Sequence, residues 1–150
     1  MKAYQAGNDA EAKRAAQDLA GDWFIAYSTW KWMEAHRATC QAPQYRYQFD
    51  QPLPGTPNAN HSAEIESVFG TQASKKVPWA EADAKLSDLM MDYWSNFAKN
   101  GDPNSPGLPQ WPAYAEKGGF QVMHLSWKPQ ALADLHRDRY LFLDSLTPQK

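Results

Sequence analysis

Apolar residues recur with helical spacing in the first forty positions of this chain. Asn8 and Glu11 have the spacing of a capping box, and an alanine-rich stretch over residues 9–20 follows, so the pattern predicts a short helix that stops at Gly21. A second helix is expected to begin at a cap on Asp22, because apolar residues then return every three or four positions. Its apolar face consists of Trp23, Ala26, Tyr27, Trp30 and Met33. We therefore expect two separate helices, the second of which buries an aromatic stripe.

The spacing changes to a period of two over residues 44–49, where Tyr45, Tyr47 and Phe49 alternate with polar side chains. This alternation predicts a β-strand. Residues 50–60 contain three prolines and one glycine, which neither a helix nor a strand ladder tolerates. A strand followed by a long loop is therefore expected here.

The second half of the chain alternates helix and strand again. A short helical turn is expected before Gly70, and the widest apolar stripe predicts a long helix over residues 80–100 that ends before Gly101. A strand is expected over residues 120–127 and a closing helix over residues 132–146. In total the pattern predicts about four helices and two strands.

This order of elements is typical of an α/β protein. The length of 150 residues fits one domain. Two strands, however, are too few for a free-standing α/β sheet, whose mean size is about five to six strands. We therefore expect a single unit over residues 1–150, mostly helical, with about two strands of an incomplete sheet.

Composition and charge exclude several function classes. Lys and Arg number 15 against 17 Asp and Glu, so a nucleic-acid surface has little electrostatic support. The longest apolar run, residues 23–27, is far shorter than the roughly 20 residues of a membrane span. Glycine-rich phosphate loops are absent, so no nucleotide cofactor is expected. The start of the chain holds no apolar signal core, and the lone Cys40 allows no internal disulfide, so the localisation stays open.

Two patterns resemble metal sites, and both are incomplete. Asp102 and Asn104 match ligand positions of a calcium-binding EF-hand loop, but the position that requires a bidentate glutamate is Ala113. His36 and Cys40 lie one helical turn apart, but two ligands do not make a zinc site. No metal and no cofactor are predicted.

His61 is the candidate with the most informative position. It follows a predicted strand and a proline-rich loop, and it directly precedes a helical turn. In open α/β sheets the loops at the carboxyl ends of strands carry the chemistry, so a histidine there is a candidate general base. The alternative is an ordinary surface imidazole, which position alone favours.

Several segments resemble the type B carboxylesterase and cholinesterase family of α/β-hydrolases. Residues 61–70, HSAEIESVFG, are similar to the segment around the catalytic histidine of that family. Residues 86–104, LSDLMMDYWSNFAKNGDPN, and residues 108–114, LPQWPAY, resemble a later stretch. Residues 45–49, YRYQF, resemble the family strand that leads into the histidine loop. The resemblance extends over residues 4–146.

The resemblance implies that His61 is the base of a Ser-acid-His triad that hydrolyses small carboxylic esters through an acyl-serine intermediate. Glu64 stands where the family usually has a glutamate, and we interpret it as a carboxylate that holds the histidine loop rather than as the triad acid. Trp94, Phe97 and Trp111 are interpreted as packing residues of the long helix. The alternative is that they line an acyl or alcohol pocket.

The other triad members are not expected in this chain. In α/β-hydrolases the order along the chain is Ser, then acid, then His. The 60 residues before His61 contain one serine, Ser28, and no Gly-x-Ser-x-Gly elbow. Asp50 ends the strand that feeds the loop, and the other upstream carboxylates fall on or beside predicted helices. We therefore expect the C-terminal portion of such an enzyme, inactive alone.

An alternative reading is a non-catalytic fragment that binds a partner or completes a hydrolase made from another chain. In either case the strand at residues 45–49 should have lost at least one parallel neighbour, and the stripe of Trp23, Tyr27 and Trp30 is expected to have lost its cover. Self-association, or pairing with the missing N-terminal part, is therefore expected. Complete family members are often secreted or periplasmic, and any signal peptide would belong to that missing part.

Overall fold

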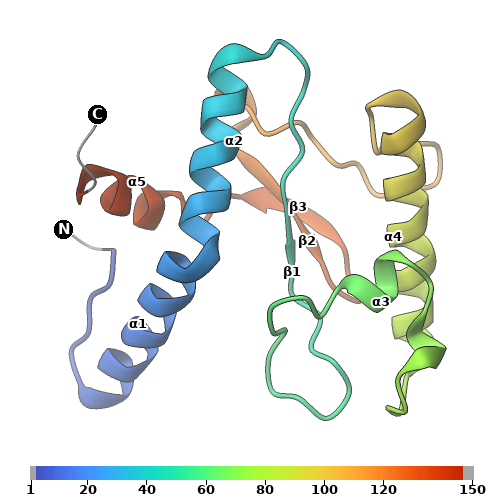
Figure 1. Ribbon diagram of the computed structural model, residues 1–150, viewed down its shortest axis with the longest axis horizontal. Coiled ribbons are helices and arrows are strands. Elements are labelled where there is room, and N and C mark those ends of the chain that lie inside the picture. The colour runs from blue at the N-terminus through green and yellow to red at the C-terminus, as the bar shows by residue number, and fades with distance from the viewer. Residues whose placement is uncertain (1–2, 147–150) are drawn as a thin grey trace. The chain divides into compact units, whose positions relative to one another are not determined.

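The structure, a computed structural model, describes residues 3–146 (Figure 1). Contacts within the chain divide it into two compact units. The first contains the residues up to Ala42 and those from Asp134 onward, and the second is Pro43–Ala133. The expectation of one unit over the whole chain stays a prediction. Within residues 3–146, no helix combines the length and the apolarity that crossing a bilayer requires.

The first unit holds α1, Asp9–Gly21, a π-helical turn at Asp22–Ala26, α2, Tyr27–Thr39, and α5, Arg137–Leu146. The predicted break at Gly21 is wrong. Gly21 has ordinary helical angles, φ −66° and ψ −43°, and the helix continues through it. Asp22 does not cap a new helix, because its carboxylate is buried and accepts hydrogen bonds from the Tyr4 hydroxyl (2.8 Å) and Arg139 Nε (2.7 Å).

The π-helical turn also changes which residues share the buried face. Tyr27 N–H bonds to the carbonyl of Asp22, five residues back, so Asp22 rather than Trp23 aligns with Tyr27 and Trp30. Trp30 is buried and stacks on Tyr140 of α5 with ring centroids 5.8 Å apart, as expected of the stripe. Trp23 is 60% exposed, so its predicted burial is wrong.

The second unit holds a three-stranded sheet of order β1-β2-β3. β1, Tyr47–Phe49, pairs in parallel with β2, Gln121–Leu125, and β2 pairs antiparallel with β3, Gln130–Ala133. The prediction of helix from residue 132 is wrong for β3. Hydrogen bonds between Ser126 and Lys128 close a tight turn (3.2 and 3.3 Å), which returns the chain alongside β2 and gives the following residues a ladder partner.

Two helices of the second unit position the candidate site. α4, Glu81–Asn100, confirms the predicted long helix and ends at Gly101, whose φ of +70° is the left-handed conformation that glycine adopts easily. The short α3, Ile65–Val68, is tied to α4 because Ser87 Oγ donates to the carbonyl of Ser67 (2.8 Å). α3, which begins shortly after His61 at Ile65, is therefore held against α4.

The core of the second unit lies between α4 and one face of the sheet. Its buried cluster comprises Leu86, Met90, Tyr93, Trp111, Met123 and Leu125. Each such side chain contributes about 1.5–3 kcal/mol by leaving water. Asn104 fixes the segment that delivers Trp111, since its amide bonds to both the N–H and the carbonyl of that residue (2.7 and 2.9 Å).

Candidate active site

The loop that carries His61 leaves the carboxyl end of β1 and reaches α3. We call residues 50–64 the His61 loop. His61 itself is exposed, whereas Ala63, two positions later, is buried at 3% exposure. Between them Ser62 has a φ of +67°, a left-handed conformation that costs a non-glycine residue about 1–2 kcal/mol. The turn is closed by a hydrogen bond from Ala63 N to the carbonyl of Asn60 (3.1 Å). His61 therefore lies on an exposed turn next to a buried residue.

Glu64, at the end of the loop, is half-buried and lies against β1. The Tyr47 hydroxyl donates to Glu64 Oε1 over 3.4 Å. Burial first, and then the neighbouring charge of Glu64, raise the pKa of Tyr47 to about 12. Tyr47 therefore keeps its proton at ordinary pH and remains a hydrogen-bond donor to the carboxylate.

A second imidazole was missed by the sequence reasoning. His124 of β2 has its Nδ1 2.5 Å from Asp50 Oδ2, and Gln48 Nε2 donates to the other oxygen of that carboxylate (2.8 Å). Asp50 N–H also bonds to the carbonyl of Leu125 (2.9 Å). The His124 side chain is 13% exposed, and its Nε2 is buried with no hydrogen-bond partner among the residues described. The pair therefore fixes the start of the His61 loop, with Nε2 of His124 shielded from solvent and the Asp50 side chain 33% exposed.

Nothing resembling a metal centre is found within residues 3–146, where no three His, Cys, Asp or Glu side chains gather. Asp102 and Asn104, which match ligand positions of an EF-hand loop, bond to each other instead. Asp102 accepts hydrogen bonds from the backbone and side-chain nitrogens of Asn104 (2.9 and 2.7 Å), and these bonds lower the pKa of the Asp102 carboxyl. Asp102 thus closes a local turn.

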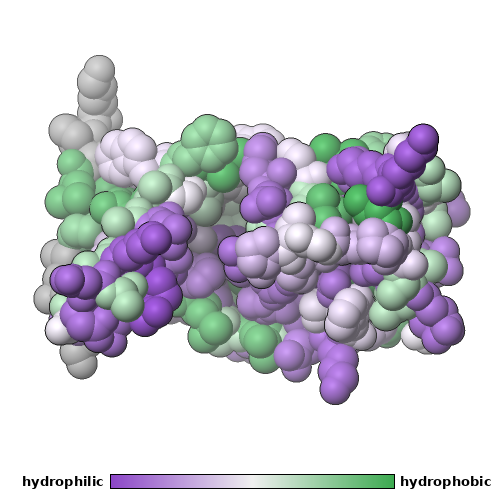
Figure 2. Space-filling model, turned by 90° about the horizontal axis from the view of Figure 1, so that it is seen from below, coloured by the Kyte–Doolittle hydropathy of each residue, from purple (hydrophilic) through white to green (hydrophobic). Residues whose placement is uncertain are grey.

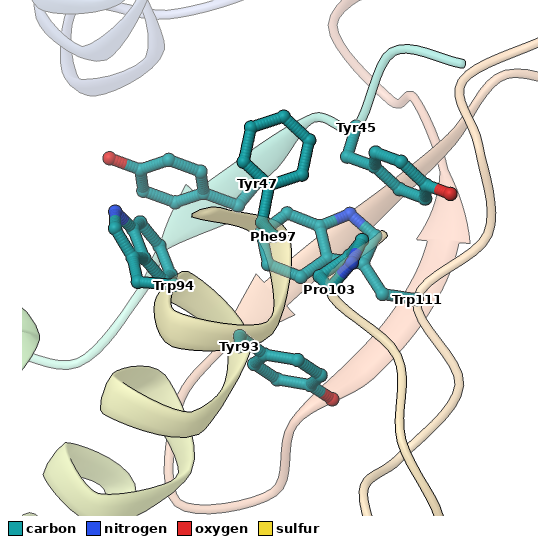
Figure 3. A pocket seen from close by; sticks show the side chains of 7 residues that line it. All are labelled: Tyr45, Tyr47, Tyr93, Trp94, Phe97, Pro103 and Trp111. Carbon is teal, nitrogen blue, oxygen red and sulfur yellow. The ribbon is translucent and has the colours of Figure 1, made fainter. Parts of the chain in front are cut away.

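An aromatic pocket of about 170 Å³ lies between β1 and α4 (Figure 3). It is lined by Tyr45, Tyr47, Tyr93, Trp94, Phe97, Pro103 and Trp111. Tyr47 meets Trp94 edge to face with centroids 5.1 Å apart, so the residue that contacts Glu64 is also a wall of the pocket. Trp94 and Trp111 pack in or against the core as expected, while Phe97 is about half exposed. The pocket is apolar and holds no titratable group other than tyrosine.

The fold corresponds to that of a known esterase. A solved structure named thermophilic PNB esterase superposes on this chain with a TM-score of 0.59 and 27% sequence identity, over 67% of this chain and 22% of that one. The molecule is therefore a partial α/β-hydrolase fold of the esterase type, as the sequence predicts.

Sequence comparison gives the family. The profile of the Carboxylesterase family matches residues 1–142, and the chain belongs to that family. It is similar to carboxylesterase 1D of Rattus norvegicus, at 37% identity over 126 residues, which is 78% of this chain and 22% of the relative. Cocaine esterase of Homo sapiens is 35% identical over 124 residues, 77% of this chain and 22% of its own. The chain thus spans about one fifth of the length of the relatives it matches.

Proposed function

We propose that this chain supplies His61 as the general base of a serine carboxylic ester hydrolase. The observation that supports this most is the exposed position of His61 on the loop after a parallel strand, in the segment that resembles the catalytic-histidine region of its family. The serine and the acid would come from the part of the family domain that this chain does not span. Glu64 would hold the loop through Tyr47 rather than serve as the triad acid.

In this mechanism the serine hydroxyl attacks the ester carbonyl while His61 takes the hydroxyl proton. The tetrahedral intermediate collapses to an acyl-serine, and His61 returns the proton to the departing alcohol. A water molecule then repeats the sequence, releasing the carboxylic acid and the free serine. His61 acts only on protons, so it needs access to the serine oxygen, and its exposed position provides that access.

The expected partner is the remainder of a family domain. β1 pairs with β2 alone in the sheet described, so its other edge is available for a parallel strand. Trp23, Phe24 and Trp32 are 60–77% exposed, and Figure 2 shows apolar side chains at the surface. Exposed aromatic surface of this extent is typical of an interface. Size-exclusion chromatography should show association, and a sharp monomer peak with cooperative melting would contradict this.

The catalytic part of the proposal is tested on the purified chain alone. A p-nitrophenyl ester should not be turned over, and a serine-directed organophosphonate should not label the protein, because no activated serine is expected. Stoichiometric labelling at a serine would contradict the proposal. The alternative, a non-catalytic module, is distinguished by the coding DNA upstream of Met1, since an in-frame Gly-x-Ser-x-Gly elbow and triad acid favour an ordinary esterase.

A further inference from the structure

The His61 loop is held to the sheet at both of its ends. At its start, Asp50 is fixed by His124 and Gln48 at 2.5 and 2.8 Å. At its end, Glu64 accepts a hydrogen bond from Tyr47 at 3.4 Å. The residues between these two carboxylates contain three prolines and no regular element. Hydrogen bonds within the loop, such as that from Thr56 N to the carbonyl of Leu53 (2.9 Å), and the buried side chains of Gln51 and Ala63 give it further support.

The two attachments lie on opposite faces of the sheet. Gln48 is in register with His124, while Tyr47, one residue earlier, is in register with Met123. Successive side chains of a strand point to opposite faces of the sheet, so His124 and Tyr47 contact the two ends of the loop from opposite faces. A loop attached on both faces cannot pivot about a single contact.

The backbone of the loop also requires firm support. Ser62 holds a φ of +67° next to His61, and a non-glycine residue keeps such a conformation only where its surroundings impose it. Ala63, the residue after this strained position, is buried. The two attachments therefore add to the contacts that hold the loop around His61 against the sheet.

We propose that His124 is a positioning residue for His61, acting through Asp50, and that Tyr47 acts in the same way through Glu64. His124 cannot itself take part in the reaction, because its Nε2 is buried. This inference rests on the proposed function of His61. The attachment of the loop to the sheet, however, can be measured without any catalysis.

The test compares His124→Phe, which removes both ring nitrogens, with His124→Asn, whose amide can still donate to Asp50. His36→Phe, at an exposed histidine of α2, is the control. Amide exchange followed by NMR at Thr56 and Ala63, which donate within the loop at 2.9 and 3.1 Å, reports the loop, and the amide of buried Met90 in α4 reports the core.

His124→Phe should speed exchange at Thr56 and Ala63 about tenfold or more and shift the imidazole resonances of His61, with no change at Met90. His124→Asn should restore most of the protection, and Tyr47→Phe should affect Ala63 more than Thr56. Unchanged loop exchange in His124→Phe, or an equal rise at Met90, would overturn the proposal. If His124→Phe does not fold, the same exchange measurements are made on Asp50→Asn, with the same expected and contradicting results.

The two proposals fail separately. Missing esterase turnover from a complemented enzyme would remove the proposed function and leave the loop attachment standing. Unchanged exchange in the variants would remove the attachment and leave the role of His61 as base untouched.

Discussion

His61 and His124 lie in the same unit, and their surroundings are opposite. His61 is exposed on a strained turn between β1 and α3, while His124 is half-buried on β2 with a carboxylate at its Nδ1. A carboxylate at Nδ1 is a contact that a triad histidine also makes. Yet its Nε2, the atom that would receive a proton from a serine, is buried.

The two residues thus differ in exposure: the side chain proposed as the base is exposed, whereas Nε2 of His124 is buried. His124 uses the Asp50 contact to fix the backbone at the start of the His61 loop. His61 lies exposed on that loop. The same residue type thus serves one loop in two ways, once as its anchor and once as its proposed functional group.

The largest difference between the two histidines should appear in stability. Replacing His124 by Ala leaves the Asp50 carboxylate without its ring partner and should lower the free energy of unfolding by about 2 kcal/mol. His61→Ala removes an exposed side chain and should change it by less than about 0.5 kcal/mol. Urea unfolding of both variants measures this, and equal losses would contradict the comparison.

The Tyr47 contact at the other end of the loop predicts a dependence on alkaline pH. The pKa of Tyr47 is raised to about 12 by burial and by Glu64, whereas an unfolded tyrosine titrates near 10. Unfolding therefore releases a proton between about pH 10 and 12, so the stability contribution is complete below pH 10 and is lost as pH rises through 12.

Unfolding at several pH values should accordingly give a shallower alkaline decline for Tyr47→Phe than for the wild type. Absorbance titration should also show one fewer tyrosine ionising near pH 12. Tyr93, whose pKa burial also raises to about 12, provides the matched control, because Tyr93→Phe leaves the loop contact intact. A Tyr47 that titrates near pH 10 in the folded chain would contradict its burial beside Glu64.

The smallest effect concerns the turn at Ser62. Glycine accepts the φ of +67° without steric cost, so Ser62→Gly should match the wild type within about 0.5 kcal/mol, relief of strain offsetting its higher entropy loss. Ser62→Val, with a branched side chain at positive φ, should lose about 1–2 kcal/mol. Thermal melting of the two variants distinguishes these outcomes, and a well-tolerated valine would argue against the left-handed turn.

The parts of the fold that the sequence predicts are those with a strong local pattern. The stripe over residues 80–100 and the stop at Gly101 define α4 without reference to the rest of the chain. β3 was missed because its strand conformation depends on the turn at Ser126 and Lys128, which supplies a ladder partner. The continuation of helix through Gly21 depends on Arg139, more than a hundred positions away.

The candidate site likewise has one part that the sequence predicts and one part that it does not. His61 stands out because its segment resembles that of a family. The pairing of Asp50 with His124 joins residues 74 positions apart and follows only from the register of β1 against β2. Neither residue has a distinctive neighbour in the sequence, so the strand periodicity predicts the two strands but not which side chains meet across them.

The central claim is that His61 is the proton acceptor of a serine esterase. The most direct measurement combines this chain with an N-terminal segment of a family esterase that carries the serine elbow and the triad acid, and follows p-nitrophenyl ester hydrolysis. The wild-type chain should restore turnover, His61→Ala should lower it about 10³-fold or more, and added imidazole should return part of the loss. Undiminished turnover with His61→Ala would contradict the account.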